Sequence, residues 1–411
     1  MHYLPVDDPE VAGLVEKEAL RINTTIDLIA SENHAPLSIM EAQGSIFTTK
    51  AVEGYPGNRF HAGCVHNDEL ENLAIVRAKK LFDAEHVNVQ PHTGVSANLA
   101  VYFSVMDIGD NVLSMQLSHG GHLSHGHSSS VTGKWFNFTH YGVNQETELI
   151  DYDEIRKLAI GTKPRMIVAG ASVYSRLIDY ERIAEIAKEV SAYVMVDMAH
   201  IAGIVAAGVI PSPVPHSDFV TFTTYKTLRG GRGGVILCKD KYAKKIDSAV
   251  FPGLQGTPFA NLIAAKAVCF KLAMEHEFVE IQKKTVENAV CLAEAFRKKG
   301  YRIVYGGTEN HIILLDLRSR GLTGIVAEEI LESVGILTNK NMIPYDPEKP
   351  MITSGLRLGT SAVSSRGMGT AEMVRIAALI DEAMANRGKA ERLDRIKAEV
   401  NGICENFPIY H

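Results

Sequence analysis

Three turns of this sequence place reactive side chains directly after short apolar runs. The first turn, His92-Thr93-Gly94, offers a hydroxyl and a glycine where a helix is predicted to begin. The other two turns carry Asp197 and Lys226 at the ends of their apolar runs. In an open sheet of parallel strands, ligands bind beyond the carboxyl ends of the strands. These residues are therefore the first candidates for a binding site.

The chemistry of the three positions is complementary. Backbone N–H groups at Thr93 and Gly94 could hold a phosphate at the helix N-terminus, and a carboxylate such as Asp197 can keep a pyridinium nitrogen protonated. A buried lysine ammonium is costly unless it is paired or used covalently, and a Schiff base on Lys226 removes that cost. Each position taken alone also has a simpler explanation: the turn at Thr93 could be a capped turn, Asp197 could be a helix cap, and Lys226 could be a surface lysine. Together they are what a pyridoxal 5′-phosphate site requires.

The elements that must position these residues alternate along the chain. Predicted helices at 67–83, 94–106 and 179–190 separate short apolar strands, which is typical of a mostly parallel sheet covered on both faces. The expected strands lie at 87–89, 112–115, 166–170, 193–197, 219–224 and 234–238. Helices are also expected from residue 9 up to an extended stretch at 28–30, over 34–50, through 259–299, and at 323–333, 370–385 and 388–402.

A change of pattern near residue 285 predicts a second domain. We expect an N-terminal helical arm and interface loop over 1–65, a large α/β domain over 66–284, and a small α+β domain over 285–411. The length of 411 residues is compatible with this division.

Composition narrows the classes of function. With 46% hydrophobic and 22% charged residues the chain is typical of a globular protein. A net charge of −6 without a basic run argues against nucleic-acid and membrane partners, so a small-molecule ligand is expected. Five scattered cysteines without a C-x-x-C pair favour neither disulfides nor zinc, and no signal-peptide or membrane-spanning run is present, so a cytoplasmic location is expected.

A histidine-rich segment, His119-Gly120-Gly121-His122-Leu123-Ser124-His125-Gly126-His127, offers two interpretations. Three or four converging ligands could bind zinc. Alternatively, the Gly-Gly pair could let His122 stack on a flat ring. The second interpretation agrees with an organic cofactor, so no metal is predicted.

As a set, these segments resemble the serine hydroxymethyltransferase family. The resemblance covers nearly the whole chain and rests on LIASEN (28–33), EGYPGNR (53–59), NVQPHTG (88–94), HGGHLSHG (119–126), VDMAHIAG (196–203), TTYKTLRGGRGG (223–234), FPGLQGTP (251–258) and SGLRLGT (354–360). It implies the fold-type I architecture of pyridoxal phosphate-dependent transferases, with a seven-stranded type of sheet. It also implies transfer of a one-carbon unit between serine and tetrahydrofolate.

The resemblance implies a role for each matching residue. Lys226 would carry the cofactor as a Schiff base, Asp197 would pair with the ring nitrogen, and His122 would stack on the ring. His200 and Ser172 would lie near the ring oxygen, Thr93 and Gly94 on the phosphate, and Ser31 and Arg357 on the substrate carboxylate. Glu53 would be the acid/base group, reaching across a homodimer or tetramer interface. The pterin would contact Leu117, Gly121, Leu123 and Asn341.

Several positions depart from the family pattern. Ala51 replaces a tyrosine whose hydroxyl reaches the neighbouring subunit's phosphate, and Thr257, in place of a glycine, offers a substitute hydroxyl. Phe60 and His61 replace a tyrosine pair, Tyr225 replaces a histidine and Met351 replaces a phenylalanine near the folate. His61 changes the size and acid/base character of the wall that faces the substrate, so it is a candidate catalytic and substrate-binding residue.

Three functions remain open. The first is serine–glycine hydroxymethyl transfer with tetrahydrofolate or a related pterin, with an α-methylserine hydroxymethyltransferase as a variant. The second is a folate-independent aldolase or transaldolase acting on a β-hydroxy amino acid such as threonine. The third, a non-catalytic binding protein, is disfavoured because Lys226, Asp197, Glu53 and Arg357 are all present.

Overall fold

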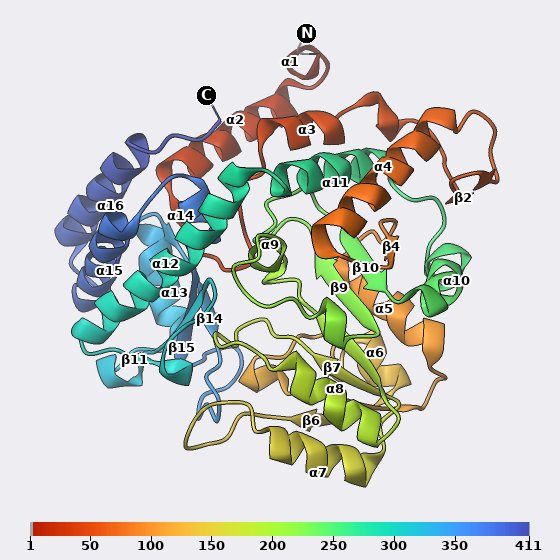
Figure 1. Cartoon of the computed structure of the whole chain (residues 1–411). Helices are drawn as coiled ribbons and strands as arrows, with labels where there is room; N and C mark the ends of the chain where they lie inside the picture. Colours follow the sequence, from red (N-terminus) through yellow and green to blue (C-terminus); the bar gives the residue numbers. More distant parts are fainter. Residues whose placement is uncertain (1–2, 411) are drawn as a thin grey trace.

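The computed structural model describes residues 3–410 and is built around a seven-stranded sheet (Figure 1). The strands follow the order β4 (His86–Asn88), β10 (Gly234–Cys238), β9 (Phe219–Thr223), β8 (Tyr193–Asp197), β7 (Met166–Ala169), β5 (Asn111–Met115) and β6 (Asn137–Tyr141). Only β10 runs against its neighbours. The carboxyl ends of the other six strands therefore meet at one edge, together with the start of β10.

Helices cover both faces of this sheet because alternate strand residues point to opposite sides. In β7, Ile167 packs on one face while Met166 and Val168 pack on the other. The first face is covered by α4 (Val65–Phe82), α7 (Tyr152–Thr162), α8 (Tyr180–Glu189), α9 (Ala202–Ala206) and α11 (Ala260–Ala273). The second is covered by α5 (Gly94–Val105) and α10 (Ala243–Ser248), with α6 (Val131–Trp135) leading into β6.

A second, antiparallel sheet carries the C-terminal part of the chain. Its order is β11 (Arg302–Ile303), β12 (Ile312–Asp316), β15 (Gly355–Gly359) and β14 (Asn339–Asn341). Its own apolar core includes residues of α12 (His276–Lys298), α13 (Gly324–Ser333), α14 (Ser361–Ser365), α15 (Thr370–Ala385) and α16 (Ala390–Glu405).

The N-terminal segment joins this second core. After α1 (Leu4–Asp7), helix α2 (Pro9–Thr24) contacts α16. The short strand β1 (Ile26–Asp27) pairs in parallel with β13 (Ile336–Leu337). The chain then passes through α3 (Leu37–Gln43), a 3₁₀ turn at Ile46–Thr48 and the hairpin of β2 (Gly54–Tyr55) and β3 (Asn58–Arg59).

The predicted α/β class and mostly parallel sheet are confirmed, but some predicted elements are wrong in detail. The single helix predicted over 34–50 is instead α3 and the 3₁₀ turn, separated at Gly44, which also ends α3. The helix predicted through 259–299 is interrupted at Glu275, whose backbone is extended although neither glycine nor proline marks the position. Strand β6 and helix α7 were not predicted.

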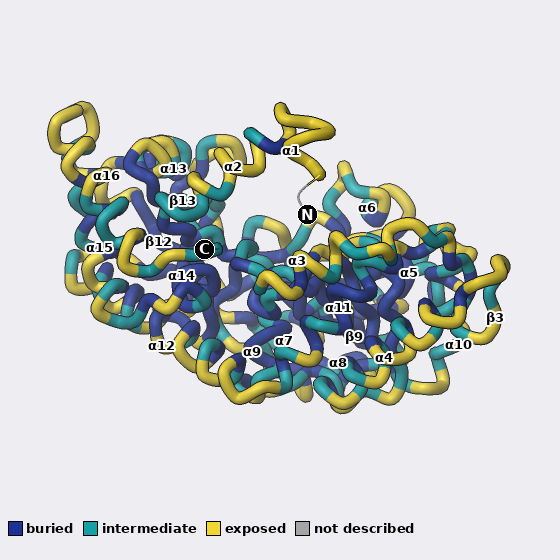
Figure 2. Tube along the Cα trace, turned by 90° about the horizontal axis from the view of Figure 1, so that it is seen from above, coloured by how far each residue is buried: buried dark blue, intermediate teal, exposed yellow. Residues whose placement is uncertain are grey.

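The predicted domain boundary at 284/285 falls inside α12, and the domain limits stay a prediction. Figure 2 shows that the buried residues concentrate along the centre of the molecule, whereas α1 and the region of β3 are largely exposed. Within residues 3–410, no helix combines the length and apolar character that crossing a bilayer requires.

Candidate active site

A pocket at the carboxyl edge of the large sheet brings together most of the residues predicted to bind the cofactor. Its lining includes seven of them, namely Thr93, Gly94, His122, Ser172, Asp197, His200 and Lys226. They follow strands β4, β5, β7, β8 and β9, which the parallel arrangement brings to the same edge. At the end of β7, Gly170 has a φ of +122°, and a Cβ there would lie 2.1 Å from the carbonyl oxygen of Asp197. Only glycine therefore allows the turn that leads to Ser172.

Lys226 is buried, and its ammonium makes no hydrogen bond or ion pair with any described side chain. Burial lowers its pKa to about 8; Asp197 raises it and the guanidinium groups of Arg357 and Arg232 lower it further. Near neutral pH the group is therefore more readily available as the uncharged amine than an exposed lysine. An uncharged, unpartnered amine in a pocket is the state in which lysine reacts with a carbonyl carbon.

Asp197 is held as a carboxylate by three donors. Its Oδ2 accepts from Asn98 Nδ2 at 2.8 Å and from His125 Nε2 at 3.1 Å, while its Oδ1 accepts from the Ala199 amide at 3.0 Å. Burial by itself would raise the pKa of Asp197, but the hydrogen bond and charge of His125 outweigh it and the pKa lies well below its ordinary value. The pocket therefore contains a fixed negative charge over the whole physiological pH range.

His122 is kept neutral and is oriented by Ser124. Its Nδ1 accepts from the Ser124 amide at 3.2 Å and lies 2.8 Å from the Ser124 hydroxyl, and burial lowers its pKa to about 4. A neutral ring at the pocket wall can stack on a flat cofactor. Donor atoms of His122, His125 and Asp197 lie within 4.8 Å of one another. Two of these atoms are already hydrogen-bonded to each other, and all three residues line the same pocket. The absence of a metal stays a prediction.

Three buried polar atoms of residues that line the pocket have no partner among the described residues. They are Thr223 Oγ1, His125 Nδ1 and His200 Nδ1. Burial lowers the pKa of His200 well below its ordinary value, and its ring stacks on His311 at a centroid distance of 5.8 Å. Buried polar groups normally have partners, so these atoms point to a ligand that carries oxygen atoms. Pyridoxal phosphate, with a ring oxygen and a phosphate, fits this donor set.

The N-terminus of α5 lines one end of the pocket, where a phosphate was predicted. Thr93 caps α5, because its Oγ1 accepts from the Ser96 amide at 3.1 Å and the Ser96 hydroxyl accepts from the Thr93 amide at 2.9 Å. Helix N-termini favour anions through free N–H groups and the helix dipole. Thr93 can therefore cap the helix and still lie next to a bound phosphate.

Arg357 lies near the pocket and forms no ion pair with a described carboxylate. Its Nε donates to Asn339 Oδ1 at 3.1 Å and its Nη1 to the Ser172 carbonyl at 2.9 Å. Burial lowers its pKa to about 10, and the guanidinium remains charged near neutral pH. An oriented cation without an anion is a receptor for a carboxylate.

The segment that contains Ser31 contacts the backbone of Lys226 and the strand that carries Arg357. Asn33 Nδ2 donates to the Lys226 carbonyl at 3.0 Å. Ala30 packs against Gly359, two residues after Arg357, so closely that a Cβ on that glycine would lie 2.4 Å from the Ala30 Cα. Ser31 follows directly and its hydroxyl makes no hydrogen bond within the described residues, so it is free to assist a ligand.

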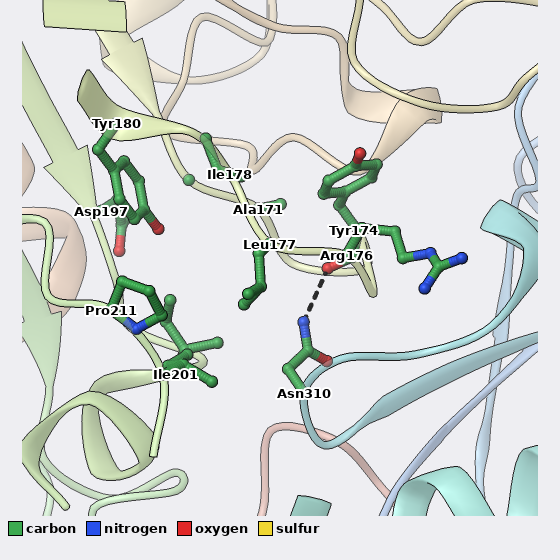
Figure 3. A pocket seen from close by; sticks show the side chains of 12 residues that line it. Ala171, Tyr174, Arg176, Leu177, Ile178, Tyr180, Asp197, Ile201, Pro211 and Asn310 are labelled. Atoms are coloured by element: carbon green, nitrogen blue, oxygen red, sulfur yellow. Dashed lines mark hydrogen bonds between the residues drawn. The ribbon is translucent and has the colours of Figure 1, made fainter. Parts of the chain in front are cut away.

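A second, smaller cavity of about 30 Å³ lies behind Asp197 (Figure 3). Figure 3 shows the Tyr180 side chain next to Asp197, with Ile201 and Pro211 close by, and Asn310 Nδ2 donates to the Tyr174 carbonyl at 3.2 Å on the other side. This space suits a few water molecules rather than an organic ligand. It therefore extends the polar surroundings of Asp197 without adding a substrate site.

The predicted residues Glu53, His61 and Thr257 do not line the pocket. Glu53 Oε2 lies 3.7 Å from His61 Nε2, and both side chains are partly exposed, at 38% and 44%. Thr257 Oγ1 accepts from the Val52 amide at 2.8 Å, so its hydroxyl fastens the loop that carries Glu53. These residues form a separate group within one chain.

The residues predicted to bind a pterin differ in exposure. Leu117 and Leu123 are 39% and 51% exposed, while a Cβ on buried Gly121 would lie 2.2 Å from the Met115 carbonyl oxygen. Asn341 lies on β14 and donates to the Met342 carbonyl. Sequence neighbours of these residues line one cleft of about 540 Å³, among them Gln116, Ser118, His119 and Met342.

Sequence reasoning missed several residues that organise the site. Asn98 and His125 hold Asp197, Thr223 offers an unpartnered hydroxyl, and Asn33 and Asn339 orient Lys226 and Arg357. Asn98 could have been found, because it is a polar residue in the apolar helix 94–105, one turn after Gly94. His125 was visible only as one histidine among four.

One comparison with known proteins places this geometry in a family. The family model described as serine hydroxymethyltransferase matches residues 4–380. That family consists of fold-type I, pyridoxal phosphate-dependent enzymes, in agreement with the sheet and the pocket. The chain belongs to the serine hydroxymethyltransferase family.

Proposed function

We propose that this enzyme transfers a hydroxymethyl group between L-serine and glycine, with tetrahydrofolate or a related pterin as the one-carbon carrier. The observation that carries the proposal is that two buried cations lie near the ionised Asp197: Lys226, whose Nζ makes no hydrogen bond within the described residues, and Arg357, which forms no ion pair with a described carboxylate. This arrangement suits an α-amino acid, because Arg357 can bind its carboxylate while its amino group lies at the cofactor. An α-methylserine type of substrate is a variant of the same proposal.

Each residue has a definite task in this proposal. Bound in the pocket, pyridoxal phosphate supplies an electron-accepting ring that stabilises negative charge at the amino acid Cα. Asp197 would hold a proton on the ring nitrogen, and His122 would stack on the ring. Lys226 Nζ would carry the cofactor between turnovers and exchange protons with the substrate nitrogen.

We further propose that Glu53 and His61 complete the pocket of a second copy of this chain. They lie outside their own pocket, and the N-terminal segment that contains them also exposes the apolar side chains of Leu37, Met40, Ile46 and Phe60. Such exposure favours self-association. A mixture of K226M and E53Q chains tests this: if Glu53 acts across the interface, mixed dimers regain one intact site and activity returns. If Glu53 acts within its own chain, the mixture stays inactive.

One observation favours the second candidate, a folate-independent aldolase or transaldolase for β-hydroxy amino acids. His61 lies beside Glu53 at 3.7 Å, so a titratable ring takes part in the wall at which the hydroxyl group of the substrate reacts. An imidazole can accept or donate the hydroxyl proton of the substrate. Once that proton is removed, the Cα–Cβ bond can break and the Cβ fragment can leave as a free aldehyde, so that no pterin is needed to accept it.

The test is a pair of turnover assays on the cofactor-loaded protein. Glycine formation from L-serine that requires tetrahydrofolate supports the main proposal, and rapid cleavage of L-threonine without folate, with serine inert, overturns it in favour of the aldolase. The H61Y variant is the matched comparison. If His61 sets the choice of substrate, H61Y shifts the ratio of the two activities toward folate-dependent serine turnover.

A further inference from the structure

A second buried lysine lies beneath the pocket and has no task in the reaction. Lys266, on α11, is 2% exposed. Its Nζ donates to three backbone carbonyls, those of Val89 at 2.6 Å, Pro91 at 3.0 Å and Gly234 at 2.9 Å. An ammonium has three N–H groups and all three are used here, whereas the neutral amine could supply only two.

The three carbonyls belong to the backbone that supports the phosphate turn. Val89 and Pro91 lie between β4 and Thr93, and Gly234 begins β10 and donates its amide to the Pro91 carbonyl at 3.0 Å. Gly234 also packs directly under the turn, since a Cβ on it would lie 2.2 Å from the Thr93 carbonyl oxygen. Lys266 therefore connects the segment after β4 with the start of β10, next to Thr93 and Gly94.

The charge of Lys266 is not balanced by a neighbouring carboxylate. Glu71 is the acidic group that acts on it, but Glu71 is itself paired with Arg59 at 2.6 Å and accepts from Gln90 at 2.7 Å. Burial lowers the pKa of Lys266 to about 7, and Glu71 raises it only in part. A buried cation without its own anion favours an anion bound nearby.

We propose that Lys266 is the positioning cation of the phosphate turn: it fixes the carbonyls of Val89, Pro91 and Gly234 and so aligns Thr93 and Gly94 to receive the cofactor's phosphate. The inference rests on the proposed role of Thr93 and Gly94 and adds a residue that does not touch the cofactor. It predicts that Lys266 affects the binding of the phosphate and not the binding of the ring.

The experiment compares the affinities of cofactor-free protein for pyridoxal 5′-phosphate and for pyridoxal, which lacks the phosphate. The variants are K266M, which removes all three donors at similar length, K266Q, which keeps two, and K271M on the exposed side of the same helix as the control. The preference for the phosphorylated form should fall about tenfold or more in K266M, because buried carbonyls lose charged donors. It should fall less in K266Q and stay unchanged in K271M, while the affinity for pyridoxal stays similar in all.

Other outcomes separate the possible failures. If the unmodified protein binds neither compound, the proposed function fails. If T93V keeps the full phosphate preference, the phosphate turn is elsewhere. If T93V loses the preference but K266M keeps it, the role of Lys266 is refuted. Should neither Lys266 variant fold, NMR of lysine labelled at Cε in the unmodified protein decides: the titration midpoint of Lys266 should rise when pyridoxal phosphate binds, and an unchanged midpoint refutes the inference.

Discussion

Replacing His125 by leucine should weaken cofactor binding, although His125 was not among the residues predicted to bind the cofactor. His125 donates from Nε2 to Asp197 Oδ2 at 3.1 Å and is 2% exposed. In H125L the carboxylate keeps the donors on Asn98 and Ala199 and loses its contact with the imidazole. Asp197 is then less well oriented, and protonation becomes easier.

The magnitude follows from the type of bond that is lost. A hydrogen bond to a charged group contributes about 1.5–3 kcal/mol. If this loss falls on the pairing of Asp197 with the ring nitrogen, the affinity for pyridoxal phosphate decreases about tenfold to hundredfold. The exposed fraction of the Asp197 side chain is 10%, so solvent screens the effect little.

The pH dependence gives a second readout. The pKa of Asp197 lies well below its ordinary value, so its charge is lost only when the pH falls through that low folded-state pKa. Without His125 the folded-state pKa rises toward the ordinary value. On acidification, H125L should therefore release the cofactor at a higher pH than the unmodified protein does.

The assay is a titration of cofactor-free protein with pyridoxal phosphate, followed by the visible absorption band, at several pH values. H125Q is the matched control, because its side-chain amide places an N–H donor at a length similar to that of Nε2. The reasoning would be refuted if H125L and the unmodified protein bind pyridoxal phosphate with equal affinity and release it at the same pH on acidification. A loss of the same size in H125Q would assign the effect to packing rather than to the donor.

Three further predictions concern other parts of the chain. Arg357→Lys should raise the KM for the amino acid about tenfold or more, with a smaller effect on kcat, because one ammonium cannot bind a carboxylate bidentately. Steady-state kinetics check this prediction, and an unchanged KM contradicts it. Thr257→Val should lower kcat, whereas Thr257→Ser should keep it, because a hydroxyl is needed to accept the hydrogen bond from the Val52 amide next to Glu53. A fully active valine variant would show that this bond is dispensable. Arg59→Met should reduce the free energy of unfolding by about 3–5 kcal/mol, because it leaves Glu71 buried without its partner; denaturant unfolding checks this, with the exposed R21M as control.

Residues at strand ends were predictable from the sequence because a local pattern fixes them. Thr93, Asp197 and Lys226 each follow an apolar run, and in parallel strands such positions meet at one edge whatever the details of packing. Their convergence therefore did not depend on exact element boundaries. The roles proposed for Glu53 and His61, in contrast, would depend on a neighbouring chain, and no pattern within one chain reveals which side chains cross an interface.

Supporting residues were not predictable, for a different physical reason. Lys266 is a lysine within an ordinary helical pattern and becomes significant only because α11 places it under three carbonyls from two distant segments. His125 became significant through contact with Asp197, which is 72 positions away. Long-range packing decides such pairs, and a single sequence carries little trace of it.

The unpaired cations around the pocket indicate how the protein selects its ligands. Arg59 has two carboxylate partners, whereas Lys226, Lys266 and Arg357 form no ion pair with any described carboxylate. A ligand that brings a phosphate and a carboxylate supplies the missing anions and stabilises the folded state, by about 2.7 kcal/mol at a concentration of about a hundred times Kd. An analogue that lacks either anion leaves a buried cation unpaired. Discrimination against that analogue therefore comes from the unbalanced charge of the protein itself.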